Sequence, residues 1–301
     1  MAGVRLRAGG GGPRVKGPVG GRASDPARGA RGRCDPVAAA LFLWLGAVLL
    51  FTLAPILFVF AYAFSSVSYA VFPPPGFSLR WFERLLAQHD LLRAALNSLL
   101  VALAATAGSL ALGTLAALGL VRYRFTGREV LRAVFLAPLI VPRIAFGVAV
   151  MVYMILLRRF GGLDSLVLAH LMVTLPFAIS ILSASLVSAE RVLEEAAMDL
   201  GATPLQTFVR VTLPQIRTGL AVSAFFAFII SWDQVETSLF LVKTDNVTLP
   251  VAMFYYIQRH QDPVIAALST VLIAAAAVAG VVVVAATDPR DLSRLLGAGG
   301  R

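Results

Sequence analysis

Six apolar segments, each long enough to cross a lipid bilayer as a helix, constrain this sequence more than any other feature. A hydrocarbon layer about 30 Å thick needs about 20 residues of helix, and only helices or closed barrels satisfy their backbone hydrogen bonds in lipid. Hydrophobic residues make up 58% of the chain and charged residues 14%. The sequence therefore predicts an all-α bundle of six transmembrane helices. They are expected at about 37–64, 95–121, 133–157, 166–187, 219–240 and 264–286.

Two polar tails flank the predicted membrane domain of residues 37–287. Residues 1–36 contain ten Gly and four Pro among scattered arginines, a composition that buries too little apolar surface to offset chain entropy. We expect a disordered basic tail here and a second short tail at 288–301. The first tail lacks a signal-peptide pattern, so the first apolar segment is expected to remain as a span. Cys34 is the only cysteine, which excludes an internal disulfide.

The positions of arginine and lysine predict the orientation in the membrane. Positive charge is retained in cytoplasmic loops. With a cytoplasmic N-terminus, 18 of the 26 basic residues fall on that side and seven on the other. We therefore predict a multi-pass protein with both termini in the cytoplasm and no nucleic-acid partner. A membrane scaffold that recruits nucleic acid through its Arg/Gly tail is an alternative.

Small residues and prolines distinguish the expected spans from one another. The second span is rich in Ala, Gly and Ser at spacings of three and four residues, which lets neighbouring helices approach closely and predicts a packing helix. Pro138 and Pro142 in the third span, and Pro176 in the fourth, remove helical hydrogen bonds. Kinks are expected at these prolines.

The loop between the fourth and fifth spans, residues 188–218, is predicted to be helical. Ser188 is placed to cap a helix over residues 189–200, and Arg191 and Glu195 are spaced to pair across one turn. This helix has an apolar face suited to a groove on a partner protein. The residues on that face are Val192, Leu193, Ala196, Ala197 and Leu200.

A tight turn is predicted after this first helix. Gly201 occupies the position of a left-handed C-terminal cap. Thr203 and Pro204 supply the N-cap and the first-turn proline of a second helix. The loop is therefore expected to be a helix, a turn and a helix.

The same loop contains a spaced pattern: Glu195-Ala196-Ala197, three residues, Gly201, nine residues, and then Val211-Thr212-Leu213-Pro214. This pattern resembles the signature of binding-protein-dependent ABC importer permeases, with valine at 211 where the family usually has isoleucine. The resemblance implies that the loop contains the coupling helix that docks into an ATPase subunit. It assigns that role to Glu195, Ala196, Ala197, Gly201, Val211, Leu213 and Pro214.

The resemblance extends over about residues 40–287. It includes Asn97-Ser98-Leu99 and residues 112–117, while residues 72–82 and 249–253 look most like the spermidine/putrescine branch. The implied fold is that of a type I ABC importer permease in a bacterial inner membrane. The implied partners are an ABC ATPase dimer, a second homologous permease and an extracytoplasmic solute-binding protein.

No enzymatic site is predicted. The sequence lacks a G-x-x-x-x-G-K-[ST] phosphate loop, so ATP is expected to bind a separate chain, and no cofactor is expected here. No nucleophile elbow or paired-carboxylate context indicates a catalytic residue. His89, His170 and His260 are too dispersed for a metal site and are interpreted as loop or packing residues.

Ionisable residues inside spans are costly unless they are paired or line an aqueous path. Asp233 and Glu236 lie three residues apart in the fifth expected span and are predicted to share a helical face. Trp232 beside them offers a ring for stacking against a cation. Arg143 in the third span either pairs with one of these carboxylates or faces an anionic group of a solute. These four residues are the candidate translocation path.

The solute stays open between two chemical classes. The carboxylates suit a polyamine such as spermidine or putrescine. In the polyamine branch, however, the position matched to Arg143 is usually acidic, and the position matched to Gln234 is often a carboxylate. A zwitterionic or carboxylate-bearing solute is therefore a competitor. A stand-alone channel or an ion-coupled carrier is the main alternative to an ATP-driven importer.

Overall fold

The computed structural model describes residues 36–286, apart from the side chains of Pro36, 279–280 and 282–286. Every regular element in this range is a helix, so the all-α prediction is confirmed. The chain forms two compact units, Met1–Pro55 and Ile56–Arg301, whose boundary lies inside the first helix. The expected tails lie outside the described residues, except for Pro36.

Helix α1 (Pro36–Ala63) contains the described part of the first unit. Its sequence has no Asp, Glu, Lys or Arg. The Thr52 hydroxyl donates to the Val48 carbonyl at 2.8 Å, so this polar group is satisfied within the helix itself. An uncharged helix with internally satisfied polar groups is compatible with a lipid environment.

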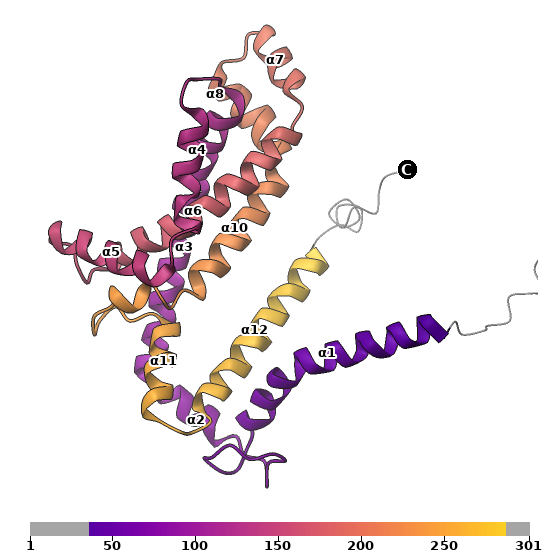
Figure 1. Cartoon of the computed structure of the whole chain (residues 1–301), viewed down its shortest axis with the longest axis vertical. Coiled ribbons are helices and arrows are strands. Elements are labelled where there is room, and N and C mark those ends of the chain that lie inside the picture. The colour runs from indigo at the N-terminus through magenta and orange to yellow at the C-terminus, as the bar shows by residue number, and fades with distance from the viewer. Residues whose placement is uncertain (1–35, 287–301) are drawn as a thin grey trace, which may run out of the picture. The chain divides into compact units, whose positions relative to one another are not determined.

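The second unit begins inside α1, at Ile56, and continues after α1 as a series of helices (Figure 1). Two of them, α3 (His89–Arg122) and α6 (Leu163–Ser188), are long. The others are α2 (Arg80–Leu86), α4 (Arg128–Leu136), η2 (Ala137–Leu139), α5 (Arg143–Leu156), α7 (Arg191–Asp199), α8 (Pro204–Thr207), η3 (Phe208–Thr212), α9 (Leu213–Gln215), α10 (Arg217–Trp232), η4 (Ser238–Phe240), α11 (Leu249–Arg259) and α12 (Val264–Ala286).

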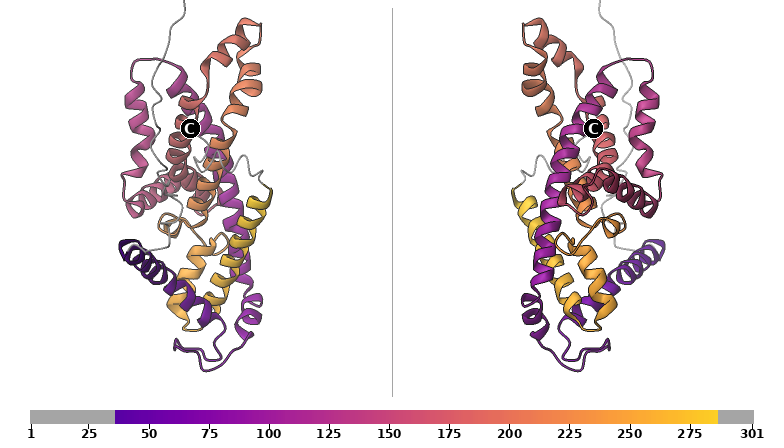
Figure 2. Two further views of the ribbon diagram at one scale, coloured as in Figure 1. Left: turned by 90° about the vertical axis from the view of Figure 1, so that its right-hand side faces the viewer. Right: turned by 90° about the vertical axis from the view of Figure 1, so that its left-hand side faces the viewer.

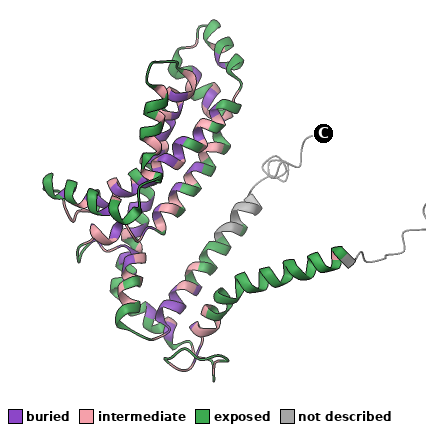
Figure 3. Cartoon of the chain, viewed as in Figure 1, coloured by how far each residue is buried: buried purple, intermediate pink, exposed green. Residues whose placement is uncertain are grey.

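Helices α3, α6 and α10 pack side by side in the second unit (Figure 2). A Cβ atom added to Gly113 of α3 would lie 3.0 Å from the Ala178 Cβ of α6, so the two backbones approach closely where glycine stands. Nearby, the Ser109 and Thr174 hydroxyls form a hydrogen bond of 2.6 Å. Buried residues follow the packed parts of these helices (Figure 3). The prediction of a packing helix rich in small residues is confirmed.

Three helices are long and apolar enough to cross a membrane, judged by length and composition: Val37–Ala63, α3 and α6. Two bent helix pairs raise the number of candidate spans in the described residues to at most five. The sixth expected segment corresponds to α12, of which Val264–Val278 is a shorter apolar helix. The helices thus follow the six expected segments, but two of those segments are broken.

The third expected span is divided by a sharp bend. Helix α5 turns by 103° from the segment formed by α4 and η2. Pro138 lies within η2, and Pro142 immediately precedes α5, so the expected kink is a complete break in the helix. Helix α6, in contrast, runs through Pro176 without interruption.

The fifth expected span ends earlier than the hydrophobic pattern indicates. Helix α10 stops at Trp232 rather than near residue 240. Residues 233–237 are not helical, and η4 follows them. At its other end, α10 meets the segment from α8 to α9 at an angle of 74°. The prediction of one continuous helix over 219–240 is therefore wrong.

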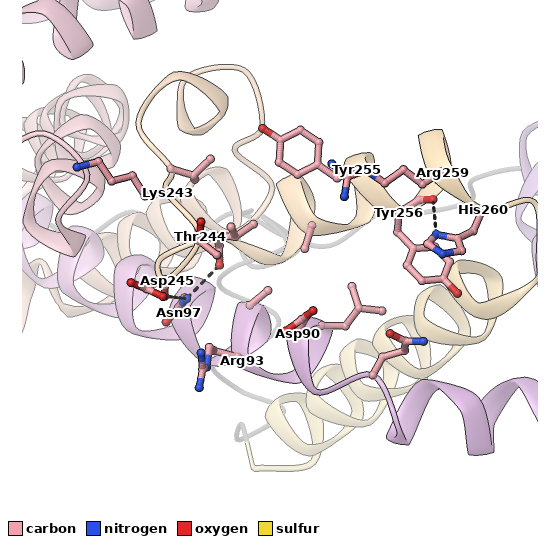
Figure 4. Close-up of a pocket in the computed structure, with 16 residues that line it drawn as sticks. Asp90, Arg93, Asn97, Lys243, Thr244, Asp245, Tyr255, Tyr256, Arg259 and His260 are labelled. Atoms are coloured by element: carbon pink, nitrogen blue, oxygen red, sulfur yellow. Dashed lines mark hydrogen bonds between the residues drawn. The ribbon is translucent and has the colours of Figure 1, made fainter.

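The end of the second unit that contains α11 lies opposite the end that contains α7 (Figure 1). A cavity of about 640 Å³ opens there between the start of α3, the loop 242–247 and α11 (Figure 4). Asn97 anchors that loop, because its Nδ2 donates to the Asp245 and Val247 carbonyls at 3.2 and 3.1 Å. Lys243 points toward Phe160, whose carbonyl accepts from Nζ at 3.1 Å.

Candidate functional sites

Helix α7 forms the first half of the loop between α6 and α10. It begins after Glu190, whose backbone N–H donates to Gln215 Oε1 at 2.9 Å. The Ser188 hydroxyl donates back to the Ala184 carbonyl at 3.2 Å, within α6. The predicted capping role of Ser188 is wrong, because α6 extends to this residue and uses its hydroxyl internally.

Gly201 closes α7 in the predicted left-handed conformation, with φ of +91°. Its N–H donates to the Met198 carbonyl at 2.9 Å, and the Ala202 N–H donates to the Ala197 carbonyl at 3.0 Å. These bonds satisfy carbonyls that the helix end leaves without partners. No atom lies within 4 Å of an added Cβ, so the backbone conformation alone favours glycine here.

Thr203 and Gln206 form a capping box at the start of α8. The Gln206 N–H donates to Thr203 Oγ1 at 3.3 Å, and the Thr203 N–H donates to Gln206 Oε1 at 2.9 Å. Pro204 is the first residue of α8. The predicted cap and first-turn proline are confirmed, and α8 continues through η3 into α9.

The outer side of this loop is apolar and exposed to solvent. Leu200 is 90% exposed and Val192 72% exposed. We call the exposed apolar side chains on the outer face of α7, with Leu200 at its C-terminal end and Leu205 of α8, the α7–α8 surface. It comprises Val192, Leu193, Leu200 and Leu205.

The signature residues lie along this loop in different environments. Glu195 is exposed and accepts from Arg191 Nε at 3.0 Å, which confirms the predicted pair across one turn. Ala196 is exposed and Ala197 half-buried. Further along, Pro214 is exposed, and Val211 and Leu213 are half-buried. The structure thus brings the signature into one surface loop.

Sequence reasoning missed Glu194, the neighbour of Glu195 in the chain. Glu194 is only 8% exposed. Its Oε1 accepts from Arg122 Nη2 at 2.9 Å and from Thr212 Oγ1 at 2.9 Å. One carboxylate oxygen therefore joins α7 to the end of α3 and to η3.

A second group of polar residues lies where α5 begins and α10 ends. Arg143 is the first residue of α5, and its Nη1 lies 3.8 Å from Glu236 Oε2. Both side chains are about half exposed, at 51% and 45%. The structure therefore brings these two predicted residues together as a partly solvated ion pair.

Asp233 and Trp232 do not join this pair. Because α10 ends at Trp232, Asp233 and Glu236 do not share a helical face, and that prediction is wrong. Asp233 is exposed and forms no ion pair with another described residue. The Trp232 ring stacks on Phe228, with centroids 5.8 Å apart. The Asp233 carboxylate, directly after the end of α10, is thus accessible to a ligand.

Buried hydrogen bonds support the break after α10. His170 of α6 contacts Ser231 Oγ through Nδ1 at 2.7 Å and Ser238 Oγ through Nε2 at 2.8 Å. Gln234 is 1% exposed, and its Nε2 donates to Thr237 Oγ1 at 2.9 Å. Its Oε1 has no hydrogen-bond partner within the described part of the chain. His170 is thus a buried structural link between α6, α10 and η4.

We find no candidate metal site among residues 36–286. No group of three or more His, Cys, Asp or Glu side chains in this range is arranged to hold an ion. His89 and His260 are exposed, and His260 stacks on Tyr256 with centroids 4.2 Å apart.

The arrangement of helices matches that of a chain in a solved ABC transporter structure. A solved structure described as a bacterial ABC transporter involved in the import of the acidic polysaccharide alginate contains a chain that superposes with a TM-score of 0.68. The match covers 85% of this chain and 99% of that chain, at 18% identity. At this identity the likeness establishes the fold.

The chain belongs to the family of binding-protein-dependent transport system inner membrane components, whose model matches residues 109–290. It is therefore an ABC importer permease subunit and not itself an enzyme. Membership implies, in general terms, a membrane location, a separate ATPase that binds ATP, a partner permease and a solute-binding protein.

Relatives with named transport systems extend over most of the chain. The putrescine transport system permease protein PotI of Escherichia coli K12 is 33% identical over 230 residues, covering 74% of this chain and 82% of PotI. The spermidine/putrescine transport system permease protein PotC of Haemophilus influenzae is 29% identical over 198 residues, covering 66% of this chain and 77% of PotC.

Proposed function

We propose that residues 188–218 face the cytoplasm and form the loop that docks on the ATPase. The observation that carries this proposal is the exposed α7–α8 surface beside the signature residues Glu195, Ala196 and Ala197. An exposed apolar surface of this kind favours a protein partner. The left-handed conformation of Gly201 and the capping box at Thr203 fix the orientation of α7 relative to α8.

In this proposal the chain pairs with a second, homologous permease above two ATPase subunits. ATP-driven approach of the ATPases moves the loop and favours an outward-open state. A binding protein delivers solute to that state. Such a switch requires that the partners bind its two states with different affinity.

For the solute, we propose an amine-bearing molecule, with polyamines first. The relatives PotI and PotC are named for putrescine and spermidine transport. Within this chain, Asp233 is an exposed carboxylate three positions before Glu236 in the sequence, and it lies outside the Arg143–Glu236 pair. Together the three side chains carry a net charge of −1, which suits the ammonium end of a solute.

A zwitterionic solute is the second candidate. Its support is the 3.8 Å separation of Arg143 and Glu236, with both side chains about half exposed. An ion pair in water at this distance is weak. A solute carboxylate is able to compete for the Arg143 guanidinium while its ammonium group contacts Asp233.

Co-purification tests the assembly, and uptake tests the solute. We would tag the chain at its native locus, extract it in mild detergent and identify its partners by mass spectrometry. The purified complex would then be placed in proteoliposomes with its binding protein, ATP and radiolabelled putrescine, spermidine or an amino acid. Recovery of an ATPase and a second permease, with ATP-dependent amine uptake, is the expected result. Recovery of the chain alone, or uptake without ATP, would contradict the importer assembly.

A further inference from the structure

The inner side of the loop is polar, in contrast to the α7–α8 surface on its outer side. Glu194 faces inward, and its carboxylate is the acceptor for two side chains from other elements. The Arg122 and Glu194 side chains are only 14% and 11% exposed. Because a partner protein has no access to a carboxylate buried in this way, Glu194 serves a purpose within the chain.

The two donors to Glu194 belong to different elements of the chain. Arg122 is the last residue of α3. Thr212 is the last residue of η3, shortly before α10 begins, and it is 3% exposed. We call Glu194, Arg122 and Thr212 the Glu194 clamp. Hydrogen bonds to a buried charged group are strong, and removing one partner leaves an uncompensated charge. Movement of α7 therefore pulls on α3 and on the segment that enters α10.

Helix α3 is suited to carry such movement over a long distance. It is one continuous helix of 34 residues, which corresponds to a length of about 51 Å. Toward its other end, in the third turn of the helix, Ser98 Oγ accepts from the Leu249 N–H at 2.7 Å in a buried contact. Asn97 binds two carbonyls of the loop before α11. Both ends of α3 are thus tied to loops.

We propose that Glu194 is a positioning residue that transmits movement of the coupling loop through α3 to residues 242–249 at the α11 end. This inference rests on the proposed docking of the loop on an ATPase. The route from the loop into α10 is bent by 74°, whereas α6 leaves the loop as an unbroken helix that packs on α3. A bent junction absorbs movement that a straight helix transmits.

Hydrogen exchange in the assembled complex tests the inference without knowledge of the solute. The complex purified through the tagged chain is compared in nanodiscs with and without ATP and vanadate, which trap the ATPase. In the wild type, trapping is expected to change amide exchange over residues 242–249. In Glu194→Gln, we expect that change to fall at least about fivefold, the lower end of typical coupling between sites, while the ATPase still co-purifies.

Three further variants make the result specific. Glu129→Gln is the matched control, because Glu129 forms an exposed pair with Arg132 at 3.5 Å, and wild-type behaviour is expected. Thr212→Val removes one donor with little change of shape and is expected to act like Glu194→Gln, so it decides the question if the first variant does not assemble. The exchange of charges in Arg122→Glu with Glu194→Arg is expected to restore part of the response.

The outcomes separate this inference from the proposed function. An unchanged response in both Glu194→Gln and Thr212→Val would overturn the role of the clamp. No response at residues 242–249 in a wild-type complex that contains the ATPase would overturn transmission through α3. If no ATPase co-purifies with the wild-type chain, that result would instead refute the proposed docking.

Discussion

The α7–α8 loop and the junction between α5 and α10 contain the two groups of candidate residues, and they are held in different ways. In the loop, Gly201 and Thr203 fix the backbone through hydrogen bonds to residues at most five positions away. At the junction, Arg143 meets Glu236 across 93 positions, and His170 reaches Ser231 across 61.

This difference implies different sensitivity to mutation. A loop fixed by its own caps keeps its shape while it moves as a body, which suits an element that transmits force. A junction fixed by long-range contacts changes its shape when the helices around it move. The loop is therefore expected to show large effects from single backbone changes, and the junction to show graded effects on solute affinity.

The largest expected effect follows from Gly201→Pro. Proline holds φ near −65° and has no N–H, whereas Gly201 has φ of +91° and donates to the Met198 carbonyl. We expect normal amounts of the variant in the membrane and no ATP-dependent uptake. Membrane immunoblots and vesicle uptake measure the two quantities.

Gly201→Ala is the matched control for that variant. It keeps the N–H and meets no atom within 4 Å, so only the left-handed conformation is penalised, by about 1–2 kcal/mol. We expect reduced but measurable uptake. Normal uptake by Gly201→Pro at normal expression would refute the role of this turn in coupling.

Glu195→Lys is expected to have the next largest effect, a loss of uptake of about tenfold or more. The variant reverses a charge on the proposed docking side, and like charges across an interface cost several kcal/mol. ATPase co-purification should fall together with uptake. Arg191→Gln is the control, because it breaks the same exposed pair of 3.0 Å, which is worth under about 1 kcal/mol. Equal losses in both variants would assign the effect to that pair and not to docking.

Asp233→Asn tests the junction between α5 and α10, the second of the two regions compared. If Asp233 contacts the solute ammonium, loss of its charge removes a charged hydrogen bond worth about 1.5–3 kcal/mol. We expect the KM for putrescine uptake to rise about tenfold, with ATPase co-purification unchanged. Glu83→Gln is the control, since Glu83 is an exposed carboxylate of α2 and belongs to neither candidate group. An unchanged KM would remove Asp233 from the solute path.

The Arg143 position distinguishes the two classes of solute. Arg143→Gln removes the cation beside Glu236, so two carboxylates then face the solute. We expect putrescine uptake to keep or improve its KM, and uptake of a zwitterionic amino acid to become weaker. The opposite pattern would contradict the interpretation of Arg143 as a contact for anionic groups. The measurement is competition between the two solutes in the same vesicles.

Much of the loop was predictable because its signals are local. The cap at Gly201, the box at Thr203 and the Arg191–Glu195 pair all act within one or two helical turns. The Ser188 prediction failed for the same reason, since a serine at the end of one helix resembles the cap of the next. The packing face of α3 was also predictable, because small residues at regular spacings indicate close helix contacts.

Long-range contacts account for what the sequence did not reveal. Glu194 has partners 72 and 18 positions away, and its face of α7 has no distinctive composition. The end of α10 at Trp232 is marked in the sequence only by the largely polar run 233–238, because apolar residues resume at Leu239 and Phe240. A helix is able to end there because buried side chains supply partners for the freed backbone groups, as where the Ser238 hydroxyl donates to the Gln234 carbonyl at 2.8 Å.

The smallest expected effect comes from Thr203→Ala, and it tests whether the loop is truly fixed by local contacts. The variant removes the hydroxyl that accepts from the Gln206 N–H, and loss of such a cap costs about 1 kcal/mol. A factor of about five in the population of the capped loop corresponds to that energy. We therefore expect uptake to fall by no more than about fivefold, with rescue by Thr203→Ser and unchanged KM. A loss as complete as that of Gly201→Pro would mean that Thr203 touches a partner, and that local caps alone do not determine the loop.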